Sequence, residues 1–252
     1  MGWGLRFLGV GNASAVELGS ATATVECDGL PWLTIDCGAE GLSAFLAHYG
    51  HMPRALFVTH THMDHVAGFE RLFVATWFDP ERRGKVKVYV PVTVLPILHR
   101  RVAEYPNALA EGGVNFWDAF HVVPVGSSFW HDGVRLEVFP ARHHWPETAY
   151  GLRLHGSVVW TGDTRPIPET LAAFADAGEL VAHDCSLHGN PSHSGIDDLE
   201  REYPSELLGR CVLYHYASKE DGQALQVRGY RVAQRGEVIA LRETTAARTS
   251  SS

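Results

Sequence analysis

The chain of 252 residues has no uninterrupted apolar stretch that approaches the ~20 residues needed for a membrane-spanning helix. Its first residues also lack the basic and then apolar pattern of a secretory signal peptide. We therefore expect a cytoplasmic protein that does not enter a membrane. With 45% hydrophobic residues, the chain can bury a substantial core.

Closely spaced cysteine pairs are also missing. The chain has only four cysteines, and none lies near another in the sequence. This spacing argues against a disulfide framework or a cysteine-based zinc site, and it predicts free thiols in a reducing compartment. The four are Cys27, Cys37, Cys185 and Cys211.

Positive charge is scarce. The chain has 21 Lys and Arg against 29 Asp and Glu, which gives a formal net charge of −8. This balance argues against a large nucleic-acid partner, because such partners usually need a basic surface. We interpret the local pairs Arg82-Arg83 and Arg100-Arg101 as solvated surface positions.

No internal repeat and no linker divides the chain, so we expect one domain over residues 1–243, and the small polar stretch 244–252 is predicted to be a disordered tail. Short apolar runs alternate with turn residues and a few helical segments, which favours an α/β protein with two packed sheets covered by helices. The predicted strands are Gly4–Leu8, Thr22–Glu26, Trp32–Asp36, Ala55–Thr59, Val86–Val90, Val134–Phe139, Val158–Trp160, Glu179–Ala182, Val212–Tyr214 and Val238–Leu241. The predicted helices are Leu42–Tyr49, Val66–Arg71, Val92–Val102, Glu169–Ala175, Ile196–Tyr203 and Asp221–Arg228.

One short segment holds four side chains that can bind metal. It reads His60-Thr61-His62-Met63-Asp64-His65 and directly follows the apolar run 55–59. Imidazole and carboxylate suit zinc and similar divalent ions. The alternative is a histidine-rich surface loop, since the chain has 15 His. Three His and one Asp at the end of a strand favour a metal site instead, because functional groups concentrate on loops held by a rigid sheet.

This segment resembles the HxHxDH signature of the metallo-β-lactamase superfamily. Further segments on both sides of this signature match the family's motifs in their usual order, and together they cover nearly the whole chain. The resemblance implies the αβ/βα sandwich fold. The matching segments are Leu8-Gly9-Val10-Gly11, Leu33-Thr34-Ile35-Asp36-Cys37-Gly38, His143, Thr161-Gly162-Asp163-Thr164 and His215.

The resemblance also implies a centre of two divalent metal ions, zinc first and manganese or iron as alternatives. A water or hydroxide that bridges the ions would be the nucleophile. The implied ligands of the first ion are His60, His62 and His143; those of the second are Asp64, His65 and His215; Asp163 bridges both.

Some of these assignments have alternatives. His143 and His144 are adjacent, and His143 is favoured because Pro140 and Trp145-Pro146 frame it as in the family pattern. Asp163 could instead be a turn residue, and His215 a core histidine. Asp36 is the candidate partner that orients a ligand imidazole, although it could simply form the turn before Gly38.

Three later segments resemble the ribonuclease Z and phosphodiesterase branch of the superfamily: Tyr150-Gly151-Leu152-Arg153, the run Leu180 to Cys185, and His193-Ser194. That resemblance makes His193 the candidate general acid, which protonates the leaving oxygen, with Asp184 as its acidic partner. Asp64 and His193 are thus the candidate catalytic residues. The alternative for His193 is a position in a surface loop.

One feature of ribonuclease Z is absent. Its tRNA-gripping arm would be inserted between His143 and Asp163, but only 20 residues separate them, and they read as a plain hairpin. We therefore expect a small-molecule phosphodiester, such as a cyclic nucleotide, as the substrate. Rival interpretations are a lactonase or thioesterase with the same metal core, and a non-enzymatic binding or sensor protein. The aromatic-rich segment 73–130 could line the pocket or form a homodimer surface.

Overall fold

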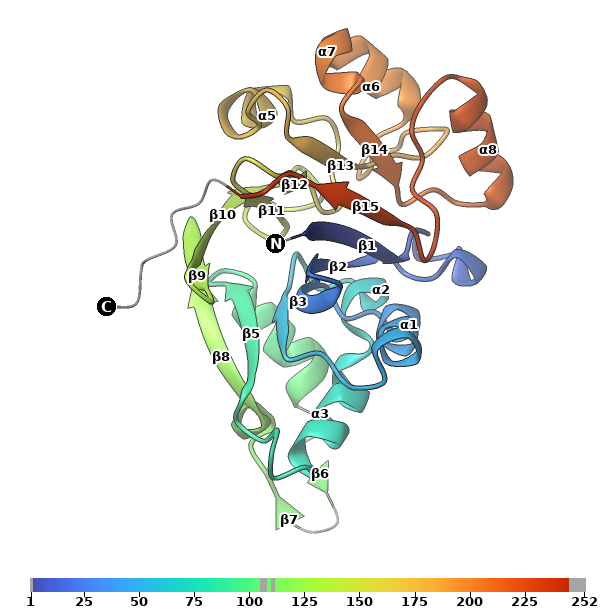
Figure 1. The fold of residues 1–252 in the computed structure, drawn as a ribbon. Helices are drawn as coiled ribbons and strands as arrows, with labels where there is room; N and C mark the ends of the chain where they lie inside the picture. Colours follow the sequence, from blue (N-terminus) through green and yellow to red (C-terminus); the bar gives the residue numbers. More distant parts are fainter. Residues whose placement is uncertain (1, 105–107, 110–111, 245–252) are drawn as a thin grey trace.

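The computed structural model describes residues 2–104, 108–109 and 112–244. Two β-sheets pack face to face, and helices cover their outer faces (Figure 1). This confirms the predicted αβ/βα sandwich. The first sheet has the order β15 (Val238–Leu241), β1 (Trp3–Gly9), β2 (Thr22–Cys27), β3 (Leu30–Ile35), β4 (Ala55–Phe57), β5 (Val86–Pro91) and β8 (Phe120–Val125).

The second sheet has the order β14 (Cys211–Tyr214), β13 (Leu180–Asp184), β12 (Val158–Trp160), β11 (Tyr150–Leu154), β10 (Val134–Pro140) and β9 (Ser128–His131). A short hairpin pairs β6 (Ala108–Leu109) with β7 (Gly112–Gly113). The helices are α1 (Ala39–Tyr49), α2 (Met63–Val66), α3 (Phe69–Trp77), α4 (Leu95–Leu98), α5 (Pro168–Phe174), α6 (Ile196–Glu202), α7 (Ser205–Leu208) and α8 (Lys219–Val227). None of the helices in the described residues is long and apolar enough to cross a membrane.

The main hydrophobic core lies between the two sheets. Large side chains from both sheets meet there, and the rings of Trp160 and Tyr214 stack with centroids 4.1 Å apart. A second cluster lies between the first sheet and its helices, where Phe69 and Phe73 of α3 are fully buried. None of the four cysteines forms a disulfide, as predicted, and all but Cys27 are buried.

The parallel strands bring several loops to one edge of the sandwich. Strands β3, β4 and β5 run parallel in the first sheet, and β12, β13 and β14 run parallel in the second. The loops that follow β3, β4, β12 and β14 carry Asp36, His60, Asp163 and His215. The carboxyl ends of parallel strands share an edge, so the fold collects candidate ligands from distant parts of the sequence.

The structure corrects two predicted helices. The helix expected from Val66 to Arg71 is two helices, α2 and α3, separated at residues 67–68. The backbone passes so closely at Gly68 that an added Cβ would lie 2.7 Å from the carbonyl oxygen of Cys37. The helix expected over 92–102 begins only at Leu95 and continues into a π-helical turn, His99–Ala103.

The strand predictions also need corrections. The run 55–59 ends as a strand at Phe57, so the chain is already irregular two residues before His60. Strands β8 and β9 were not predicted. Alternation in β8 is broken by Pro124, whose ring cannot donate a ladder hydrogen bond, and this fits an edge strand of the sheet. The predicted tail 244–252 lies outside the described residues except for Thr244.

Arg153 of β11 is the centre of a buried cluster of ion pairs in the second sheet. Only 5% of Arg153 is exposed, and its guanidinium donates to both oxygens of Glu179, which is 1% exposed. It also donates to Glu137 at 2.9 Å and to Asp176 at 2.6 Å. A guanidinium with this many partners balances the charge of the buried carboxylate.

We therefore predict that Arg153→Ala lowers the free energy of unfolding by about 3–5 kcal/mol, because it leaves Glu179 charged and buried without a counter-ion. Urea unfolding measures this. The matched control is Arg135→Ala, since Arg135 is exposed and pairs with the same Glu137; it should cost below about 1 kcal/mol. Equal losses in the two variants would contradict this role of Arg153.

Candidate metal centre

The signature segment turns from extended chain into helix α2, and this bend directs its side chains inward. His62 has an extended backbone and precedes α2, whose first residues include Asp64 and His65. The backbone nitrogen of His65 donates to the carbonyl of His62 at 2.9 Å, which closes the turn. His60 and His65 are almost fully buried, and His62 and Asp64 are partly exposed.

Three imidazoles converge at one side of this centre. Nδ1 of His62 lies 3.2 Å from Nε2 of His60 and 3.1 Å from Nε2 of His143. Oδ2 of Asp163 lies 3.6 Å from Nε2 of His60. The sequence separates these residues by up to about a hundred positions, and the structure places their ligand atoms within 4.8 Å of one another.

A second cluster shares the same aspartate. Oδ2 of Asp163 lies 3.2 Å from Nε2 of His65 and 3.2 Å from Nε2 of His215. Oδ2 of Asp64 lies 3.4 Å from Nε2 of His65 and 3.8 Å from Nε2 of His215. All seven residues predicted as ligands are therefore brought together, and Asp163 is common to both groups.

The donor atoms fit two metal ions. Tetrahedral zinc with bonds of about 2.0–2.1 Å separates its ligands by roughly 3.3 Å, close to the nitrogen–nitrogen distances of the first cluster. In the second cluster, Nε2 of His65, Nε2 of His215 and Oδ1 of Asp163 are buried without a hydrogen-bond partner. Buried polar atoms are rarely left in this state, and a bound ion would account for them.

The electrostatics also suit cations. Burial opposes ionisation of Asp163, but His215, His65 and His60 outweigh it and hold the pKa of this carboxyl well below its usual range. Burial lowers the pKa of His143 to about 4, so its imidazole is neutral near pH 7. A metal ligand must be an ionised carboxylate or a neutral imidazole, and these two residues meet that requirement.

Neighbouring groups fix the orientation of the imidazoles. Asp36 is fully buried, and its Oδ2 lies 2.8 Å from Nδ1 of His65. The same carboxylate accepts from the backbone nitrogen and the hydroxyl of Thr59. The carbonyl of Ser192 lies 2.9 Å from Nδ1 of His143. The predicted contact of Asp36 with an imidazole of the cluster is thus confirmed, whereas nothing in the sequence indicated Ser192.

The two adjacent histidines differ in position. Nε2 of His143 points at the shared site, and its ring is buried. His144 is exposed and lies behind His62, with its Nε2 2.9 Å from Nε2 of that residue. The geometry therefore favours His143 as the member of the cluster and leaves His144 outside it.

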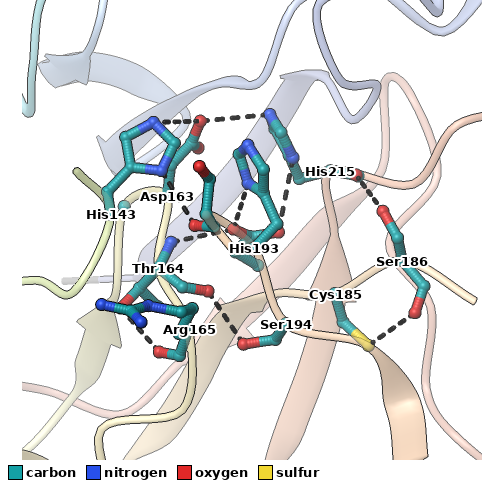
Figure 2. A network of polar contacts seen from close by, with 12 residues as sticks. His143, Asp163, Thr164, Arg165, Cys185, Ser186, His193, Ser194 and His215 are labelled. Carbon is teal, nitrogen blue, oxygen red and sulfur yellow. Dashed lines mark hydrogen bonds and ion pairs between the residues drawn. The ribbon is translucent and has the colours of Figure 1, made fainter. Parts of the chain in front are cut away.

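His193 lies beside the centre, between His143 and His215 (Figure 2). Its Nδ1 is 2.8 Å from Oδ2 of Asp184, whose other oxygen is 3.3 Å from Nδ1 of His215. Asp184 therefore orients His193 and borders the metal centre at once. The backbone nitrogen of Thr164 also donates to Asp184, which fixes the carboxylate.

Asn190 shapes the loop that carries His193. Its side-chain oxygen accepts from the backbone nitrogens of Ser192 and His193 at 2.8 and 3.1 Å, and its own backbone nitrogen donates to the carbonyl of His193. Asn190 was not among the residues predicted from the sequence. An Asn two and three residues before the donors is a pattern typical of such turns, so the signal was present.

A cavity of about 710 Å³ opens over the centre. Both halves of the fold contribute to its wall, and His193 lies on it together with several ligands of the two clusters. The lining residues are Asn12, Ala13, Ser14, Ala39, Glu40, His62, Met63, Asp64, Ala67, Arg101, Asp163, Ser186, Asn190, His193 and His215.

Comparison with known proteins agrees with this geometry. The model of the family described as "Anti-Pycsar protein Apyc1" matches residues 3–239. The chain belongs to the Apyc1 family. An anti-Pycsar protein Apyc1 from Saccharibacillus brassicae is 31% identical over 235 residues, which cover 86% of this chain and 91% of that protein.

The chain is also similar to more distant relatives and to several solved structures. Ribonuclease Z from Mycobacterium sp. (strain KMS) is 26% identical over 214 residues, covering 77% of this chain and 70% of that protein. Among solved structures, the metallo-β-lactamase fold protein YhfI from Bacillus subtilis aligns with a TM-score of 0.73 at 14% identity, over 95% of this chain and all of that one. A diphosphatase from the PhnP family aligns with a TM-score of 0.75 at 16% identity, over 97% and 99%. These structural similarities show the fold.

We predict that Asp36→Asn weakens metal binding about 10–100-fold, because the amide nitrogen that replaces one oxygen cannot accept the proton of His65. Both Asp36 and the exposed Asp132 have positive φ, which Asn tolerates, so Asp132→Asn is a matched control. Competition with a chromophoric chelator measures the affinity. Equal affinity in the Asp36 variant and the wild type would show that this carboxylate does not support the metal centre.

Proposed function

We propose that this protein is a phosphodiesterase with two metal ions that hydrolyses a cyclic nucleotide. The observation that carries the proposal is the shared aspartate between two histidine clusters, with the His193–Asp184 pair beside it. The chain belongs to the family described as anti-Pycsar protein Apyc1, and it is a metal-dependent phosphodiester hydrolase.

The first ion would be held by His60, His62 and His143, and the second by Asp64, His65 and His215. Asp163 would contact both, because a carboxylate has two oxygens. Five imidazoles and two carboxylates favour zinc over magnesium or calcium, which prefer oxygen ligands. When bound, two such ions supply a nucleophile from water near neutral pH and stabilise the negative charge on the phosphoryl oxygens.

His193 would protonate the leaving group. Because Nδ1 of His193 faces Asp184, its Nε2 is left to face the cavity, where it makes no hydrogen bond with any described residue. Hydrolysis adds the hydroxyl of water to phosphorus and breaks one phosphorus–oxygen bond. The leaving sugar oxygen takes its proton from Nε2, and Asp184 stabilises the imidazolium that precedes this transfer.

The size of the substrate follows from the walls of the site. Strands β11 and β12 form the expected short hairpin between His143 and Asp163, so this stretch has no arm that could grip a tRNA. The cavity volume of about 710 Å³ lies in the range of small-molecule sites. A small phosphodiester therefore suits this chain better than a large nucleic acid.

The rival lactonase or thioesterase would need an apolar cleft for its acyl substrate, whereas Glu40, Asp64, Arg101 and Asp163 line this cavity. The buried Asp184 that orients His193 favours a substrate whose leaving oxygen needs a proton, which a phosphodiester has and a thioester lacks. The cytoplasmic location, the homodimer and the single domain over residues 1–243 stay predictions.

We predict that alanine at His143 removes far more bound metal than alanine at His144. His143 offers its Nε2 to the shared site, whereas His144 only contacts the outer nitrogen of His62. Elemental analysis of both purified variants measures the loss. A greater loss from the His144 variant would reverse the assignment.

We also predict that the zinc-loaded protein hydrolyses a 3′,5′-cyclic nucleotide, and that His193→Ala lowers kcat about 10²–10⁴-fold with unchanged metal content. The loss should shrink for bis(p-nitrophenyl) phosphate, whose leaving group needs little protonation. His188→Ala is the matched control, because His188 is an exposed histidine in the same loop. A uniform loss across leaving groups would exclude general acid catalysis by His193.

A further inference from the structure

The cavity over the metal centre contains one cationic side chain that the proposed chemistry does not use. Arg101 is the sole Arg or Lys among the described residues that line it. Its guanidinium is exposed and forms neither a hydrogen bond nor an ion pair with any other described residue. The sequence analysis interpreted Arg100-Arg101 as a solvated surface pair, and the structure separates the two residues.

The backbone under Arg101 is firmly held. Arg101 lies in the π-helical turn His99–Ala103 that continues helix α4. Leu98 and Ala103 are fully buried and Val102 is 6% exposed, in the cluster beneath the first sheet. Trp117 also donates to His99 at 2.9 Å. Isolated π-helical turns are rare and frequently occur at functional sites.

The same turn directs two consecutive arginines to different places. Arg100 lines an apolar surface groove together with Trp117, and Arg101 lines the cavity of the metal centre. The two residues therefore share local sequence, exposure and charge but differ in what they face. This makes Arg100 an internal control for any role of Arg101.

Two asparagines on the cavity wall also offer donors. The side-chain oxygen of Asn12 accepts from both the backbone nitrogen and the hydroxyl of Ser14, and that of Asn190 accepts from two backbone nitrogens. Each asparagine therefore keeps its amide nitrogen for a ligand. These two amide groups and the guanidinium of Arg101 suit a ligand group that only accepts hydrogen bonds, and an ionised phosphodiester is such a group.

The cavity also contains carboxylates, which repel an anionic substrate. Glu40, Asp64 and Asp163 line it, and the protein as a whole carries a net charge of −8. An anionic substrate must approach this negative surface. A fixed positive charge at the rim reduces the repulsion and attracts the phosphate.

We propose that Arg101 is a substrate-binding residue that donates hydrogen bonds to the phosphate group of the phosphodiester. It acts in binding and recruitment, and it holds no metal. This inference rests on the proposed function, since it assumes that a phosphodiester occupies the cavity.

The test compares Arg101→Ala, Arg101→Lys and Arg100→Ala in the zinc-loaded protein, with metal content measured for each. The substrates are a 3′,5′-cyclic nucleotide and bis(p-nitrophenyl) phosphate, which has a phosphate and no nucleobase. Arg101→Ala should raise KM about tenfold or more for both substrates, since charge-assisted hydrogen bonds are among the stronger ones. Arg101→Lys should restore part of the loss, and Arg100→Ala should match the wild type.

Two further readouts report on substrate binding and recruitment. The inhibition constant of inorganic phosphate should rise in Arg101→Ala, and kcat/KM should fall less steeply with added salt than in the wild type, because a charge that attracts the substrate is gone. Unchanged KM for both substrates would show that Arg101 is a solvated surface residue without a role in substrate binding. A rise for the cyclic nucleotide alone would assign it to the nucleobase and overturn the proposal, as would loss of metal. A wild type with no phosphodiesterase activity would instead refute the proposed function.

Discussion

The organisation of the site depends on one buried carboxylate. Asp163 is 1% exposed, and its Oδ2 lies within 3.9 Å of four imidazoles: His60, His65, His143 and His215. A charged group at this depth is stable only when cations or donors surround it. Two metal ions held by the surrounding histidines would meet that need, and the aspartate would in turn fix the distance between them.

The sandwich makes this convergence possible. Parallel strands in both sheets end at one edge, and their loops carry the ligands and Asp36. Side chains at the ends of rigid strands are positioned more accurately than side chains in long loops. The loop of His193 is longer, and it is fixed by Asn190 and by the contact of His193 with Asp184. The two sides of the cavity would thus perform different tasks: the ligands at the strand ends would hold the ions, and the loop would present the proton donor.

Much of this site could be predicted from the sequence because its ligands follow apolar runs at family spacing. The choice of His143 over His144 depended on flanking prolines. In the structure the two rings stack, but His143 is buried and faces Nδ1 of His62, whereas His144 is exposed and faces Nε2 of that residue. The break at Gly68 could not be predicted, because it results from close contact with Cys37, a residue distant in the sequence. The separation of Arg100 from Arg101 likewise depends on a π-helical turn, which hydrophobic periodicity does not reveal.

Metal stoichiometry and turnover, measured on the same preparations, test whether Asp163 joins two metal ions in one catalytic centre. We expect close to two zinc ions per wild-type chain, with hydrolysis of a cyclic nucleotide. In Asp163→Ala, bound metal and turnover should fall together, because both clusters lose their shared ligand. Two tightly bound ions and full turnover in that variant would show that Asp163 does not join the two metal ions.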